Sequence, residues 1–292
     1  MRIAHSLPAL VLAVLSAYPA MAQEFDPATN TKGWTRADAD GSFTVYDAAG
    51  KRLITWMKDG TTLGHVDLSK LEGPPESWVI DSYGNAWVVV GNFLHQVDKK
   101  GKVGNRIRLP GTVADMAWEP RGLILAYRAT EPYVEKREYK NGNVMWSWGS
   151  KPSGPSSPAS LFRVTATSNN EVVVTRGASL AVDILDLQSG KHLRQLNFAY
   201  KGAVAPELAL ASSDRGALVW WSGKNLALAA VPGNQAGFTK MNGLLLARID
   251  IIAQAVEFLP TGLTDDHALV GVVENEAAFV NPKGGMVFVP VR

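Results

Sequence analysis

Five charged residues recur at related positions along the sequence, and their side chains could bind a cation or a polar ligand. Each lies 7–10 residues before a residue predicted to form a tight turn; they are Glu76, Asp115, Arg163, Glu207 and Glu257. Hard cations such as Ca²⁺ prefer oxygen ligands, which the four carboxylates offer. The Arg163 guanidinium could instead anchor a polar ligand. The same pattern would also arise from solvated charges at the starts of strands.

The short motifs that usually mark an active site do not occur in the sequence. We find no G-x-S-x-G, no G-x-x-x-x-G-K-[ST] and no H-E-x-x-H. The segment 37–42 resembles the start of a calcium loop, but Phe43 stands where glycine is required and Ala49 where glutamate is required. We therefore predict a turn at 37–42.

Four histidines remain after residue 22, and the sequence brings no two of them together. We place two on outer strands, one in the turn of an inner hairpin and one in a link between repeats; in that order they are His95, His192, His267 and His65. Structural histidines are the simpler interpretation of this scatter.

The elements that must position these residues are short strands. Apolar, β-branched and aromatic runs such as 86–90 and 171–175 are bounded by Gly, Asn, Asp and Pro. Two series of turns interleave at regular intervals, which indicates a repeat of four antiparallel strands. The outer series is Gly50, Gly101, Gly142, Gly190, Asn234 and Gly284, and the inner series is Gly84, Gly122, Asn170, Gly216 and His267.

The repeat predicts an all-β fold, a six-bladed β-propeller of four-stranded antiparallel blades. The first blade should be incomplete, because 42–57 forms one clear hairpin and only 33–36 precedes it. Either this blade is abbreviated, or a strand from the other terminus completes it and closes the ring. A seven-bladed ring or an open sandwich remains the alternative. The innermost strands of a propeller line a central channel, so the five charges would meet at one mouth.

Two blades resemble known propellers in their residues. Residues 78–88 (WVIDSYGNAWV) are similar to the inner hairpin of NHL-type and virginiamycin B lyase-like blades. Residues 182–196 (VDILDLQSGKHLRQL) are similar to the outer hairpin of YVTN and quinoprotein-dehydrogenase-like blades. The resemblance implies a fold and a superfamily rather than an activity. In the lactonase- and lyase-like members a cation is held at the channel mouth, which implies a divalent cation such as calcium for the carboxylates here.

The first 22 residues predict export. Arg2 precedes an apolar stretch at 7–17, and Ala20 and Ala22 form an A-x-A cleavage pattern. Cleavage after Ala22 would leave 23–292 as a single propeller domain in the periplasm or outside the cell. The stretch is too short to span a bilayer, and 244–259 is interrupted by charges, so no membrane span is expected in the mature chain.

The composition narrows the classes of function. Without Arg2, 28 Lys and Arg face 27 Asp and Glu with no polybasic block, so no nucleic-acid partner is expected. The absence of cysteine excludes thiolate metal sites, thiol nucleophiles and haem attachment through cysteine. Two long links, 58–75 and 149–158, should emerge beside the charged strand starts, where loops commonly bind ligands.

These features favour a non-catalytic binding or scaffold protein that uses the loop-bearing mouth of its channel. Its partner would be another envelope protein or a small polar ligand. The alternative is a metal-dependent hydrolase or lyase of lactone-like substrates, with the four carboxylates as cation ligands. A third interpretation is an accessory subunit of a quinoprotein-type redox system, for which the sequence shows no cofactor motif.

Overall fold

The described part of the chain is built from strands. The computed structural model describes residues 36–37, 42–128, 132–149, 163–167, 169–175, 182–196, 199–200, 218–221, 226–232, 243–250, 252–253, 255–281 and 285–291. Twenty-four strands occur in these ranges. No helix long and apolar enough to cross a bilayer is found in them. The signal-like segment 1–22 lies outside the described residues.

The strands form six sheets, which we number in chain order. Sheet one is β1 (Arg36–Ala37), β2 (Phe43–Asp47), β3 (Arg52–Trp56) and β4 (Thr62–Asp67). Sheet two is β5 (Ser77–Ile80), β6 (Ala86–Val90), β7 (Phe93–Val97) and β8 (Val103–Arg108). Sheet three is β9 (Val113–Glu119), β10 (Gly122–Tyr127), β11 (Val134–Arg137) and β12 (Val144–Trp148). Sheet four is β13 (Arg163–Ala166), β14 (Glu171–Thr175), β15 (Val182–Asp186) and β16 (His192–Leu196). Sheet five is β17 (Ala199–Tyr200), β18 (Leu218–Trp221), β19 (Leu226–Pro232), β20 (Leu244–Asp250) and β21 (Ala255–Pro260). Sheet six is β22 (Ala268–Val273), β23 (Glu276–Val280) and β24 (Met286–Pro290).

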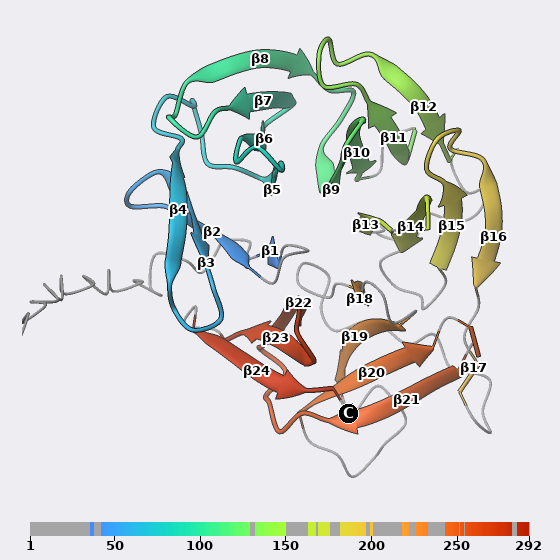
Figure 1. Ribbon diagram of the computed structural model, residues 1–292. Helices are drawn as coiled ribbons and strands as arrows, with labels where there is room; N and C mark the ends of the chain where they lie inside the picture. The colour runs from blue at the N-terminus through green and yellow to red at the C-terminus, as the bar shows by residue number, and fades with distance from the viewer. Residues whose placement is uncertain are drawn as a thin grey trace, which may run out of the picture.

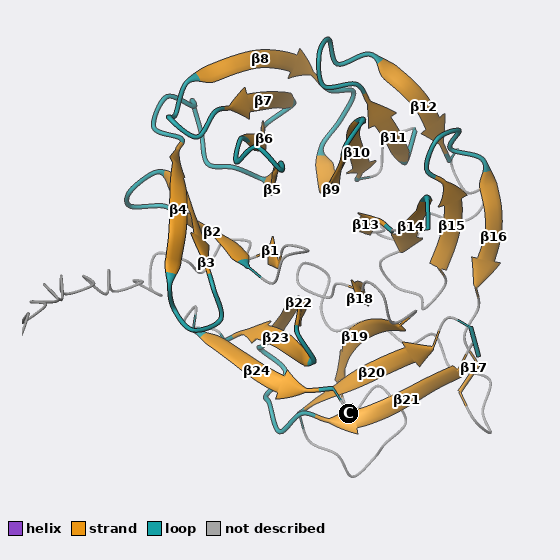
Figure 2. Ribbon diagram, in the orientation of Figure 1, coloured by secondary structure: helices purple, strands orange, loops and turns teal. Residues whose placement is uncertain are grey.

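The sheets stand around a central axis as the blades of a β-propeller (Figures 1 and 2). In each sheet the chain starts near the axis and moves outward through antiparallel neighbours. The exception is β17, which pairs in parallel with the outer edge of β21. The all-β propeller with antiparallel sheets is thus confirmed.

The number of strands per sheet corrects part of the prediction. Five sheets have at least four strands, whereas sheet six has three, so the expected six four-stranded blades are met only in part. Sheet one does have four strands, but its innermost strand β1 spans only two residues. Among the described strands, none from the other terminus completes it. The sheet with fewest strands is therefore the last and not the first.

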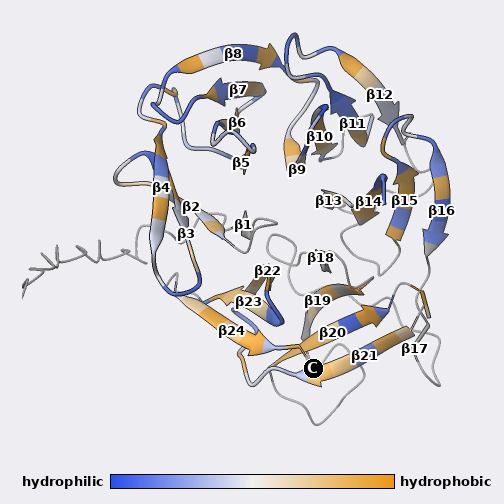
Figure 3. Cartoon of the chain, viewed as in Figure 1, coloured by the Kyte–Doolittle hydropathy of each residue, from blue (hydrophilic) through white to orange (hydrophobic). Residues whose placement is uncertain are grey.

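Apolar side chains fill the spaces between neighbouring sheets. Strands such as β6 (AWVVV) and β10 (GLILAY) are buried along almost their whole length, because both faces of an inner strand contact other sheets. Trp87 and Met116 share the core between sheets two and three. Trp146 and Leu185 share the core between sheets three and four. Hydrophilic stretches occur on outer strands such as β8 and β16 (Figure 3).

Side chains join the first and last sheets. Phe43 contacts Phe288 with ring centroids 5.6 Å apart. Lys58 pairs with Glu274 at 3.2 Å and with Glu276, and its ammonium lies 5.4 Å from the Phe288 ring centroid. An apolar contact with an ion-pair cluster at its edge therefore links residues more than 200 positions apart in sequence.

The turn series is right in sheets two, three and four and wrong in sheet one. Gly101, Gly142 and Gly190 separate the third and fourth strands of their sheets, with φ of 77°, 72° and 69°. Glycine adopts these angles at little cost. Gly50 lies instead between β2 and β3, which are the second and third strands of sheet one. Because the first strand of sheet one has only two residues, the sequence pattern assigns the hairpin around Gly50 to the third and fourth strands, although it joins the second and third.

Asp98 organises one of these turns and makes it sensitive to acid. Its Oδ1 accepts the amides of Lys102 at 2.9 Å and Lys100 at 2.8 Å. The amide hydrogen bond from Lys102 is the main cause that lowers the pKa of Asp98 below 3.8. A carboxylate with a lowered folded-state pKa stabilises the fold above its ordinary pKa and loses that contribution as the pH falls through the lowered value.

We therefore expect Asp98→Ala to be less stable than the wild type at pH 7, and this gap to narrow in acid as the pH falls through the lowered pKa of Asp98. Urea unfolding of both proteins at pH 7 and in acid measures this difference in the free energy of unfolding. Asp98→Asn keeps one acceptor oxygen and is the control. Its deficit should be smaller at pH 7, and it should narrow in acid by the same amount, because in both comparisons only the wild-type Asp98 titrates. A gap that is equally wide at pH 7 and in acid would contradict the assigned role.

Candidate functional site

The innermost strands define one end of the ring, where the predicted site should lie. The sheets repeat the same outward order, so their innermost strands begin at the same end. Glu76 lies directly before β5 and is exposed. Its amide donates to Val89 O at 2.8 Å, and its Oε1 accepts the Gly91 amide at 3.1 Å. The structure thus fixes Glu76 at this end, which we call the channel mouth.

Asp115 and Arg163 lie on the next two innermost strands. Asp115 is in β9 and 8% exposed, and its Oδ2 accepts the Val164 amide of β13 at 3.1 Å. Val164 directly follows Arg163, the first residue of β13. The hydrogen bond therefore ties two neighbouring blades together beside Arg163. Glu76, directly before β5, and Asp115 and Arg163, in β9 and β13, thus lie on three consecutive blades.

The other two predicted members do not join them. Glu257 lies in β21, three strands away from the innermost strand of its sheet, where it is exposed and pairs with Arg248 at 3.1 Å. The prediction that Glu257 lies at the start of an innermost strand is wrong. It depended on His267 forming the turn of an inner hairpin, and His267 does not lie in such a turn. The first hairpin of sheet six turns at Glu274 and Asn275 instead. Glu207 lies outside the described residues.

His267 lies at the channel mouth, directly before the innermost strand β22, and the sequence reasoning missed this position. Its side chain is 15% exposed. Its Nδ1 lies 3.1 Å from Asp266 Oδ1, 3.1 Å from Thr264 Oγ1 and 3.2 Å from Thr264 O. The Thr264 hydroxyl, with His267 as a further contact, holds the pKa of Asp266 below its usual range. The signal was the polar run Thr-Asp-Asp-His directly before an apolar strand.

The remaining histidines lie away from the mouth. His95 and His192 are on outer strands, as predicted, whereas His65 is in β4 and not in a link. His192 Nε2 lies 3.0 Å from Asp183 Oδ1, and its ring stacks on Trp148 at 5.9 Å between centroids. Within the described ranges, no three His, Asp or Glu side chains come close enough to form a metal site.

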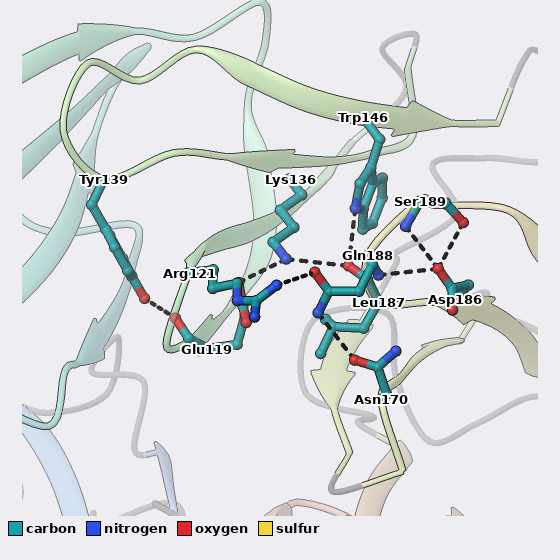
Figure 4. Close-up of polar contacts among 10 residues, drawn as sticks. All are labelled: Glu119, Arg121, Lys136, Tyr139, Trp146, Asn170, Asp186, Leu187, Gln188 and Ser189. Carbon is teal, nitrogen blue, oxygen red and sulfur yellow. Dashed lines mark hydrogen bonds and ion pairs between the residues drawn. The ribbon is translucent and has the colours of Figure 1, made fainter.

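A buried polar network joins sheets three and four (Figure 4). Lys136 is fully buried; its Nζ lies 2.8 Å from Glu119 Oε1 and donates to Leu187 O at 3.2 Å. Trp146 Nε1 donates to the same carbonyl at 3.1 Å, and the Tyr139 hydroxyl donates to Glu119 O. Because the ammonium and its carboxylate have almost no exposure, this network stabilises the contact between blades and offers no ligand site.

Comparisons with known proteins agree with this fold. The chain is similar to virginiamycin B lyase from Staphylococcus aureus, with TM-score 0.57, 12% identity, and 88% of this chain and 80% of that chain covered. A streptogramin B lyase has a TM-score of 0.53 at 12% identity, with 90% of this chain and 84% of that chain covered. BamB from Moraxella catarrhalis has a TM-score of 0.48 at 14% identity, with 86% of this chain and 70% of that chain covered. No family model and no curated protein matches the sequence. The first two likenesses confirm the propeller resemblance at the level of the fold alone.

Proposed function

We propose that this chain is a binding or scaffold protein that holds its ligand at the channel mouth. The arrangement of Glu76, Asp115 and Arg163 at the innermost strands of three consecutive blades, with Glu76 directly before β5, carries the proposal. The Asp115 hydrogen bond to the next blade holds this region rigid, and rigid positioning lowers the entropic cost of binding. An exposed carboxylate at position 76 and an arginine at position 163 at the same end of the ring suit a partner with both donors and acceptors.

The proposal includes the setting of the protein. The segment 1–22 would direct export and be removed after Ala22, leaving 23–292 as a single domain in the periplasm or outside the cell. The domain would be a closed ring of six blades, with sheet six as its three-stranded member. The partner would be another envelope protein or a small polar ligand, and no nucleic acid.

Affinity capture from an envelope extract tests this function. The bait would be the mature chain, compared with Glu76→Gln/Arg163→Gln and with Glu257→Gln. The last variant is a matched control, because it removes a charge that lies on an outer strand. We expect the double variant to recover the partner at least about tenfold less well, as two charge-assisted contacts are removed. Equal recovery by all three baits would overturn the proposal.

A metal-dependent hydrolase or lyase is the second candidate. The two solved structures with TM-scores above 0.5 are named as lyases. His267, held by Asp266 and Thr264, would supply an acid or base at the same end of the ring as Glu76 and Asp115. The chemistry would be hydrolysis or elimination on a lactone-like substrate. A divalent cation such as calcium would need ligands beyond the described carboxylates, because no three His, Asp or Glu side chains among the described residues come together.

Thermal unfolding separates the two candidates. If the mouth binds a cation, saturation at about 100 Kd should stabilise the mature chain by about 2.7 kcal/mol, which raises the midpoint by several degrees. Differential scanning fluorimetry with Ca²⁺, Mg²⁺, Mn²⁺ or Zn²⁺, each followed by EDTA, measures this shift. A shift that EDTA reverses and Glu76→Gln abolishes supports the enzyme. Unchanged midpoints with all four cations exclude it.

A further inference from the structure

Strand β8 lies at the outer edge of sheet two, on the perimeter of the ring (Figure 1). One side of β8 pairs with β7, and in the part of the chain that the structure describes no strand pairs with its other side. An edge strand presents unpaired backbone amides and carbonyls to any extended chain that approaches it. The edge of β8 is therefore a place where another strand could be added.

One face of β8 is fixed against the neighbouring blade. Asn105 Nδ2 donates to Lys140 O at 3.1 Å. A Cβ placed on Gly142 would lie 2.7 Å from Ile107 Cδ1, so the Ile107 side chain reaches the same turn of sheet three. Since side chains alternate along a strand, Arg106 and Arg108 lie on the opposite face. Both arginines are exposed.

This opposite face carries a compact basic and aromatic cluster. Arg106 lies across from His95, and Arg108 across from Phe93, so the four side chains form two cross-strand pairs on one face. The Arg106 guanidinium stacks 3.7 Å from the Phe93 ring centroid, which restricts its position before any ligand binds. Neither arginine has an acidic partner within ion-pair distance among the described residues.

His95 completes this cluster without neutralising it. Partial burial, and next the charge of Arg106, lower the pKa of His95, so the imidazole is neutral at physiological pH. Its Nδ1 is buried and has no hydrogen-bond partner in the described structure. Glu72 is an acidic influence on this cluster, and it opposes the shift of the His95 pKa without forming an ion pair with either arginine among the described residues. Arg106 and Arg108 therefore have no ion-pair partner there, whereas Arg194 on β16 and Arg248 on β20 each pair with a glutamate.

The ring already accepts an added strand at another edge. Ala199 and Tyr200 of β17 pair in parallel with Ala255 and Val256 on the outer side of β21. The outer perimeter of a blade thus has room for one more extended segment. At β8 the spacing of the charges specifies the chemistry of such a segment, since residues two apart on a strand are about 7 Å apart.

We propose that β8 binds an extended acidic segment of another envelope protein as an added strand. Acidic side chains at alternate positions of that segment would repeat every 7 Å or so and meet Arg106 and Arg108 in register. Each guanidinium can bind a carboxylate through two parallel hydrogen bonds, while the backbone of the segment pairs with the free edge. This proposal rests on the binding function proposed above and adds a second surface for the same class of partner.

A defined peptide tests the proposal. The probe is a fluorescent seven-residue peptide that alternates valine and glutamate, and its binding to the mature chain is measured by fluorescence anisotropy. Arg106→Gln/Arg108→Gln should weaken binding at least about tenfold, because both carboxylate contacts are lost. Lys99→Gln/Lys100→Gln removes the same charge from the adjacent exposed turn and should change binding less than about twofold. Equal affinity of both double variants would overturn the proposal.

Further measurements distinguish the addition of a strand to β8 from simple attraction of an anion to Arg106 and Arg108. A peptide with the same side chains but methylated at alternate backbone nitrogens should lose binding if the edge of β8 is used. Retained binding of that peptide, or equal competition by inorganic polyphosphate, would overturn strand addition. A dimer in analytical ultracentrifugation that Arg106→Gln/Arg108→Gln dissociates would identify a second copy as the occupant and overturn the acidic partner.

The failure of this proposal is distinguishable from failure at the mouth. Glu76→Gln/Arg163→Gln should leave binding of the acidic peptide unchanged, because these residues lie at the innermost strands. If that variant loses its captured partner while the wild type never binds the peptide, the β8 proposal alone is wrong. If the peptide binds but the mouth variant captures as well as the wild type, the mouth proposal alone is wrong.

Discussion

Replacing Lys136 by methionine is expected to lower the free energy of unfolding by about 3–5 kcal/mol. The ammonium is fully buried between sheets three and four, 2.8 Å from Glu119 Oε1. Without the Lys136 ammonium, the almost fully buried Glu119 carboxylate has lost its opposite charge. The Leu187 carbonyl also loses one of its hydrogen-bond donors. Uncompensated charge in a protein interior is among the most destabilising changes known.

Guanidinium chloride unfolding of the mature chain measures this loss. The double variant Lys136→Met/Glu119→Leu should recover most of it, because two apolar side chains replace both charges at once. Arg194→Gln is the matched control: it breaks an exposed pair with Glu171, and its effect should stay below about 1 kcal/mol. If Lys136→Met were as mild as this control, the network in Figure 4 would not hold the two blades together.

Replacing Asp81 by alanine should cost about 3 kcal/mol of unfolding free energy. Its Oδ1 accepts the amides of Tyr83 and Asn85 at 2.9 Å each. Its Oδ2 accepts Asn85 Nδ2 at 3.0 Å and the buried Trp87 Nε1 at 3.3 Å. Alanine would leave the buried indole N–H without an acceptor and release the turn between β5 and β6, so the inner hairpin of sheet two would lose its anchor.

Asp81→Asn distinguishes the hydrogen bonds from the volume of the side chain. Asparagine keeps one acceptor for the two turn amides and loses the second, so about half of the loss is expected. Urea unfolding of both variants, followed by tryptophan fluorescence and by circular dichroism, gives the comparison. Equal losses for alanine and asparagine would mean that the contacts to Asn85 Nδ2 and Trp87 carry the whole effect.

Local sequence patterns were sufficient for the strands and for most turns. The runs at β6 and β14 are apolar and β-branched because inner strands are buried on both faces, and this signal is independent of the rest of the chain. The glycines at 101, 142 and 190 were found because a tight turn with positive φ favours that residue. The residues of 78–88 also predicted the hairpin of β5 and β6, to which Asp81 belongs.

The position of a strand within its blade could not be predicted in the same way. Alternation identifies a strand but does not say whether it is innermost or outermost, so Glu257 was assigned to the mouth although β21 is far from the axis. His267 was assigned to a hairpin for the same reason. The contacts that join neighbouring blades are also remote in sequence: Asp115 meets the Val164 amide 49 residues away, and Lys136 meets the Leu187 carbonyl 51 residues away.

Site-specific photo-crosslinking in living cells tests the central claim, that this propeller binds at its channel mouth. A benzophenone amino acid would replace Pro74, an exposed residue of the link beside Glu76, or Lys191, an exposed residue between β15 and β16 and away from β8. Intact-mass analysis after illumination detects protein adducts and small adducts alike. We predict adducts from position 74 that Glu76→Gln/Arg163→Gln removes, and none from position 191. No adduct from position 74, or equal adducts from both positions, would contradict binding at the mouth.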